Sequence, residues 1–219
     1  VLMRRNPDLV VVDTEIIAKA PVRLFAAGLG DALATWFEAR ACHKSGARTM
    51  ARGNVSNTAL MMSRLCYDLL MEHGVEALEA VRQHAVTKAL EDVVEASIYL
   101  SGLGFENGGL AAAHAINDGL AQEPQTHGMY HGEKVAFGVL AQLVLEDAPR
   151  DELARVLAFM KQVGLPTTFA ELGSQTVNEE NLRKAAEAAC VPTQSTRNLR
   201  ESITPEEVYQ AMQKADALG

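Results

Sequence analysis

The sequence is poor in cysteine and in positive charge. Its three cysteines, Cys42, Cys66 and Cys190, are far apart, show no CxxC spacing and have no secretory context. We therefore expect reduced thiols in the core, without disulfides. The 20 Lys and Arg residues against 28 Asp and Glu give a net charge of −8, with no basic cluster. Binding a nucleic-acid backbone requires such a cluster, so nucleic acid is excluded as a partner.

The sequence also lacks a long apolar run. The most apolar stretch, residues 135–145, is interrupted by Gln142 and is too short to cross a bilayer, and the N-terminal residues do not follow a signal-peptide pattern. A content of 48% hydrophobic and 22% charged residues is typical of a globular chain long enough to bury a large core. These features predict a soluble cytoplasmic protein that does not bind a membrane.

The first residues predict β-structure. Residues 1–3, 4–7 and 8–14 follow a strand, turn and strand pattern, and the run Leu9, Val10, Val11 and Val12 is typical of a strand buried on both faces. No comparable strand follows in the sequence, and an isolated hairpin is marginally stable in water. We therefore expect the rest of this sheet to lie in a preceding part of the protein.

From Pro21 onward the apolar spacing is helical almost throughout. Thr204 and Glu207 have the spacing of a capping box, and Gly74 and Gly164 lie where helix C-caps are expected. The predicted fold class is mainly α, a helical bundle with a short N-terminal β stump. The predicted helices cover residues 31–43, 54–72, 87–103, 108–120, 132–146, 151–163, 179–189 and 204–217.

Three residues that can bind a metal lie next to glycine or alanine: Asp31, His114 and His131. Each alone has an ordinary explanation, as a helix N-cap, a hydrogen-bonded core histidine and a helix-start residue. Together they supply two imidazoles and one carboxylate, a set that suits zinc or ferrous iron and leaves a coordination position open. That composition is typical of a catalytic metal site. His127, four residues before His131, falls in an expected loop, which argues against a chelating pair.

Residues 28–42 (GLGDALATWFEARAC), 104–115 (GFENGGLAAAHA) and 130–138 (YHGEKVAFG) resemble, in order, the signature motifs of glycerol dehydrogenases within the iron-containing alcohol dehydrogenase superfamily. The resemblance extends over essentially the whole chain. It implies a dehydroquinate synthase-like helical domain. It also implies that Asp31, His114 and His131 are the metal ligands and the catalytic centre, and that Phe105 lines the substrate pocket. Iron-dependent relatives have a further histidine where this chain has Thr35, which favours Zn²⁺ over Fe²⁺.

The resemblance further implies the reaction: NAD-dependent oxidation of glycerol, or of a related vicinal diol, to dihydroxyacetone or its counterpart. Residues 1–20 would then be remnant strands of an N-terminal α/β cofactor domain, and residues 21–219 the all-helical metal-binding domain. The glycine motif for NAD is expected before Val1. We therefore expect this chain to hold metal without turning over substrate by itself, and to assemble as a homo-oligomer.

Two other interpretations stay open at this stage. A phosphorylated-polyol dehydrogenase or a dehydroquinate-synthase-like lyase acts on an anion and needs Lys or Arg near the metal motifs, where Lys134 is the nearby candidate. The chain could instead be a non-catalytic fragment that binds metal or forms oligomers.

Overall fold

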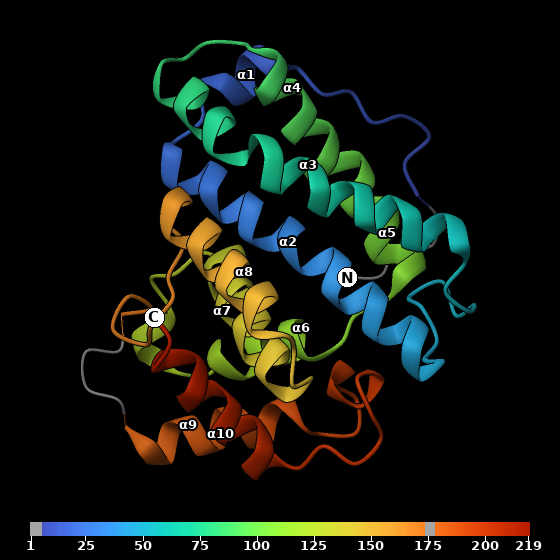
Figure 1. Cartoon of the computed structure of the whole chain (residues 1–219), viewed down its shortest axis with the longest axis vertical. Helices are drawn as coiled ribbons and strands as arrows, with labels where there is room; N and C mark the ends of the chain where they lie inside the picture. Colours follow the sequence, from blue (N-terminus) through green and yellow to red (C-terminus); the bar gives the residue numbers. More distant parts are fainter. Residues whose placement is uncertain (1–5, 174–177) are drawn as a thin grey trace.

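A computed structural model describes residues 6–173 and 178–219 of the chain. Within these two ranges the molecule is helical, and no helix there combines the length and the apolarity that spanning a membrane requires. The α-helices are α1 (Thr14–Ala18), α2 (Val22–Ser45), α3 (Asn57–Arg82), α4 (Lys88–Val94), α5 (Ser101–Gly108), α6 (Ala112–Leu120), α7 (His131–Leu145), α8 (Arg150–Val163), α9 (Glu179–Ala189) and α10 (Pro205–Asp216). In Figure 1, α2 crosses the molecule diagonally between α3 to α5 on one side and α7 to α10 on the other.

The mainly α fold class is confirmed, but the predicted β stump is wrong. Residues 9–12 form no strand, and Leu9 and Val11 are 77% and 80% exposed. A strand is stable only when neighbours complete its hydrogen bonds, and no part of the described chain does so here. Residues 1–5, the rest of the predicted hairpin, lie outside the described residues. α1 follows instead and packs against α3 and α4, with Ala18 buried.

Two helices are longer than the sequence predicted. α2 begins at Val22, directly after Pro21, and ends at Ser45, with Gly46 as its C-cap in a left-handed conformation with a φ of 73°. α3 continues through Gly74, so the predicted C-cap at that glycine is wrong. A Cβ at Gly74 would lie 2.7 Å from the ring of Phe159 on α8. Glycine stands there to let two helices approach closely, which a sequence pattern cannot distinguish from a helix end.

The predicted helix over residues 87–103 is confirmed and continues to Gly108 through a π-helical segment, η1 (Glu95–Leu100). Its N-cap is Thr87, whose side chain accepts a hydrogen bond from the backbone of Leu90. Single π turns inside α-helices occur frequently at functional sites. Here η1 and α5 form one wall of the cavity described below.

Close contact between the backbones of α2 and α7 sets the geometry of the centre. A Cβ added at Gly30 would lie 2.5 Å from the carbonyl oxygen of Gly132, and one at Gly132 would lie 1.8 Å from the carbonyl oxygen of Ala27. Both distances are too short for any side chain. The glycines therefore allow the first turn of α7 to rest directly on α2, which brings residue 131 beside residue 31.

Replacing Gly30 by alanine is expected to lower the free energy of unfolding by about 1–3 kcal/mol, because the new methyl group meets a backbone oxygen that cannot move aside. Gly28→Ala is the matched control. Gly28 lies in the same helix and has open space around it, so alanine there should raise the free energy of unfolding by roughly 0.5–1 kcal/mol. Urea unfolding of both variants measures this, and equal effects would contradict the contact.

Candidate metal centre

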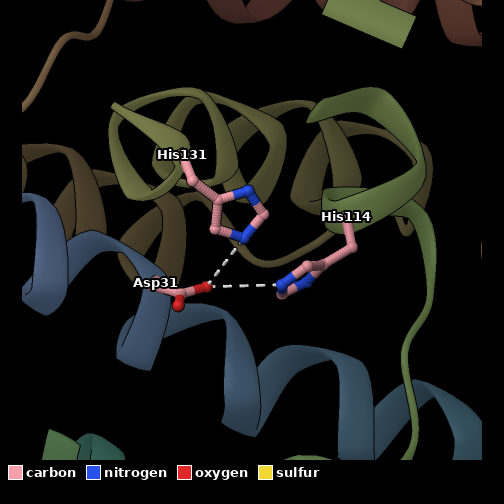
Figure 2. Close-up of side chains that lie close together, drawn as sticks. All are labelled: Asp31, His114 and His131. Carbon is pink, nitrogen blue, oxygen red and sulfur yellow. Dashed lines mark ion pairs between the residues drawn. The ribbon is translucent and has the colours of Figure 1, made fainter. Parts of the chain in front are cut away.

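The structure brings Asp31, His114 and His131 together from three helices (Figure 2). Asp31 lies in the middle of α2, His114 in the first turn of α6, and His131 at the first position of α7. The Oδ1 atom of Asp31 is 3.3 Å from Nε2 of His114 and 3.4 Å from Nε2 of His131. All three potential ligand atoms lie within 4.8 Å of one another, a spacing that one metal ion can bridge.

Glu38 orients His114. This carboxylate is fully buried, and its Oε2 atom is 2.6 Å from Nδ1 of His114. Its Oε1 atom accepts hydrogen bonds from the backbone N–H groups of His114 and Ala111, at 3.0 and 2.8 Å, which caps the N-terminus of α6. A proton on Nδ1 that is donated to Glu38 leaves the lone pair of Nε2 facing Asp31. Such a carboxylate partner is typical of histidines that bind metals.

The sequence analysis did not assign this role to Glu38. The available signal was its position seven residues after Asp31 on one helix, because that spacing places both carboxylates on the same face of α2. Seven-residue spacings are common in buried helices, so this signal is weak without the structure.

The electrostatics of the cluster favour positive charge between its carboxylates. Burial by itself would raise the pKa of Asp31, but hydrogen bonds from His114 and His131 hold that pKa well below its usual range. Burial would likewise lower the pKa of His114, yet the carboxylates of Glu38 and Asp31 raise it to about 10. His114 thus lies between two carboxylates that favour positive charge, which a proton or a divalent metal ion can supply. The donor set of two imidazoles and a carboxylate fits zinc or ferrous iron.

A cavity of about 400 Å³ opens beside the cluster. Phe105, predicted to line the substrate pocket, is 38% exposed and forms part of its wall. Thr35 lines the same cavity as the three potential ligands. Its hydroxyl group forms a 2.8 Å hydrogen bond with that of Ser101. Among the residues that the structure describes, the lining consists of Asp31, Thr35, Glu38, Ser97, Ser101, Gly102, Phe105, Gly109, Leu110, His114 and His131, and none of these is a Lys or Arg.

Other candidate residues lie apart from the cluster. The Nε2 atom of His127 contacts the carbonyl oxygen of Ala121 at 3.1 Å, as expected for a residue that is not a ligand. Lys134 is buried in α7 and does not line the cavity. Cys42 and Cys66 are buried free thiols, and burial raises the pKa of each to about 12, which makes them inert. Cys190, also free, is partly buried.

Comparison with known proteins first identifies a similar fold. No protein-family model matches the chain. Its fold is similar to part of an iron-containing alcohol dehydrogenase from Thermococcus thioreducens, which superposes with a TM-score of 0.70 at 17% identity, over 94% of this chain and 53% of that one.

The chain is more similar in sequence to glycerol dehydrogenases. A glycerol dehydrogenase from Escherichia coli O6:H1 is 54% identical over 218 residues, which is 100% of this chain and 59% of the relative. The crystal structure of a probable glycerol dehydrogenase from Sinorhizobium meliloti 1021 gives a TM-score of 0.93 at 42% identity, over 98% of this chain and 60% of that one. The chain is a homologue of the glycerol dehydrogenases and corresponds to their C-terminal part. It spans about 60% of the length of these relatives.

Replacing Glu38 by glutamine is expected to weaken zinc binding by about 10- to 100-fold. The amide would donate to Nδ1 of His114 and shift the imidazole proton to Nε2, which removes the lone pair that the metal needs. Competition with a chromophoric chelator measures the affinity, and thermal unfolding confirms that the variant is folded.

The matched control is His127→Ala, which removes an imidazole outside the cluster and should leave the zinc affinity within twofold of the parent chain. A folded Glu38→Gln variant with the parental affinity would show that Glu38 does not orient the ligand.

Proposed function

We propose that this chain provides the metal- and substrate-binding half of an NAD-dependent dehydrogenase for glycerol or related vicinal diols. The observation that carries the proposal is the cavity beside Asp31, His114 and His131. Its wall offers the hydroxyl groups of Thr35 and Ser101 and the apolar Phe105 and Leu110. Hydroxyl groups and apolar surface, with no cationic side chain among the described lining residues, suit an uncharged polyol.

Asp31, His114 and His131 are the residues that would hold the metal. A bound zinc ion supplies Lewis-acid chemistry that eases loss of the proton from a substrate hydroxyl. Glu38 keeps the Nδ1 proton of His114 in place, so the imidazole presents its Nε2 lone pair to the centre. Phe105 and Leu110 would contact the carbon atoms of the substrate, and Thr35 and Ser101 could hydrogen-bond a second hydroxyl, which orients it.

We further propose that zinc is the metal, because Thr35 stands where a fourth, histidine ligand is expected in iron-dependent relatives. Oxidation also requires NAD⁺ as the hydride acceptor, and we place its binding site outside residues 1–219. The division at residue 20 between a cofactor domain and the helical domain, the homo-oligomeric state and the cytoplasmic location remain predictions.

Anionic substrates are the less favoured alternative. A phosphorylated polyol, or the substrate of a dehydroquinate-synthase-like lyase, would need a cationic side chain in the cavity, and within residues 6–173 and 178–219 no Lys or Arg lines it. Lys134, the candidate from sequence, is buried elsewhere in α7.

The test joins the N-terminal part of the Escherichia coli relative to this chain and measures NADH formation. With zinc, glycerol and 1,2-propanediol should be oxidised with a kcat/KM about 100-fold or more above that of glycerol 3-phosphate, since the phosphate finds no partner. His114→Ala should lose the activity, whereas His127→Ala keeps it. Preference for the phosphate ester would overturn the substrate assignment. Turnover by the 219-residue chain alone, with its length verified by mass, would overturn the proposal that NAD⁺ binds outside these residues.

A further inference from the structure

His131 lies at the start of α7, where the helix backbone makes few hydrogen bonds of its own. It is the first residue of α7 and follows the non-regular segment of residues 127–130. The first four N–H groups of a helix have no partner within that helix, so a helix start depends on contacts from outside. Gly132 lets this turn rest on α2, but a contact without a side chain does not by itself fix the rotation of α7.

The outside contact comes from Arg23 on α2, and Glu133 within α7 completes a capping box at the same helix start. The Nε and Nη2 atoms of Arg23 donate to the two carboxylate oxygens of Glu133, at 2.6 and 2.8 Å. Oε2 of Glu133 also accepts from the backbone N–H of Tyr130 at 2.7 Å. Nη2 of Arg23 donates in addition to the carbonyl oxygen of Gly128 at 3.2 Å, and the guanidinium lies 5.0 Å from the ring centroid of Tyr130.

These contacts bracket His131 on both sides along the chain. Arg23 hydrogen-bonds to Gly128 and stacks near the ring of Tyr130, both before the histidine. It also forms an ion pair with Glu133 after the histidine. Arg23 lies eight residues before Asp31 on the same helix, about 12 Å along its axis. A bidentate ion pair fixes orientation as well as distance. The same rigid helix therefore carries both Asp31 and the residue that holds the turn on which His131 stands.

We infer that Arg23 and Glu133 are positioning residues that set the place of the His131 imidazole relative to Asp31, and that their main role is to shape the metal site. The inference rests on the proposed metal site. Glu38 performs the corresponding task for His114 at the other end, so α2 positions both imidazoles. Metal–ligand distances tolerate only about 0.2 Å of error, so a slight rotation of the first turn of α7 would cost affinity.

Metal readouts separate this role from a general contribution to stability. The Arg23 side chain is 55% exposed, but that of Glu133 is only 5% exposed, so loss of the arginine leaves a buried carboxylate without its ion-pair partner and also lowers the free energy of unfolding. Arg64 offers a matched control: its side chain is 49% exposed, both carboxylate oxygens of Asp68 accept from its Nε at 2.9 Å, and its guanidinium lies 5.3 Å from the ring centroid of Trp36. Arg64 belongs to α3 and does not line the cavity beside the cluster.

The experiment compares Arg23→Ala, Arg23→Lys and Arg64→Ala with the parent chain. Zinc affinity is measured by chelator competition, the ligand set by the visible absorption of bound Co²⁺, and stability by thermal unfolding. Arg23→Ala should bind zinc about 10- to 100-fold more weakly and alter the Co²⁺ spectrum. Arg23→Lys should fall between, because an ammonium group cannot form the bidentate pair. Arg64→Ala should match the parent in both metal readouts, and its melting temperature should fall less than that of Arg23→Ala, because its partner Asp68 is 46% exposed and stays solvated.

The Glu133→Gln variant adds a coupling test. Because Arg23 and Glu133 act as a pair, the double variant Arg23→Ala/Glu133→Gln should lose no more affinity than the more severe single variant. If the parent chain binds metal and Arg23→Ala keeps its zinc affinity and Co²⁺ spectrum, the positioning role is wrong and the metal site is unaffected. Arg23→Lys decides the question in the same way if Arg23→Ala is unfolded. If the parent chain itself binds neither ion, the proposed metal site fails and the inference fails with it.

Discussion

A buried carboxylate governs the arrangement of the centre. Glu38 is fully removed from solvent, and a buried charge is tolerated only when its oxygens are hydrogen-bonded. The partners are two backbone N–H groups at the start of α6 and the imidazole of His114. The Glu38 carboxylate therefore holds the start of α6 against α2, and it also selects the tautomer of His114. An apolar side chain at position 38 could accept none of these hydrogen bonds.

Small residues supply the second constraint. α2 buries alanine or glycine at many of its positions, including Ala27, Gly30 and Ala34, and its neighbours approach until backbones touch. At Gly138 of α7 a Cβ would lie 2.4 Å from the carbonyl oxygen of Ala113 on α6, so these two helices meet in the same manner. Close packing of three helices leaves little freedom for residues 31, 114 and 131. The potential ligands converge because the scaffold around them is tight.

Much of this could be predicted from the sequence, and the failures have physical causes. The helical period, the capping box at Thr204 and Glu207 and the Gly164 C-cap were found because they depend on neighbouring residues. The β stump was wrong because β-branched residues favour a strand only where a sheet is present to pair with them. Gly74 was misassigned because glycine marks both helix ends and close contacts.

The residues of the site likewise fall into those that the sequence could predict and those that it could not. Asp31, His114 and His131 could be proposed together from their chemistry and their motifs, and the structure places them within bridging distance of one metal ion. Glu38 and the Arg23–Glu133 pair could not, because ordinary helical sequences contain many charged residues, and only the fold shows which of them meet a ligand. The central claim is that one metal ion binds to Asp31, His114 and His131. In crystals of the zinc-loaded chain, an anomalous difference map at the zinc edge should show one strong peak about 2.0–2.2 Å from Asp31, His114 and His131. A peak on other residues, or none, would contradict it.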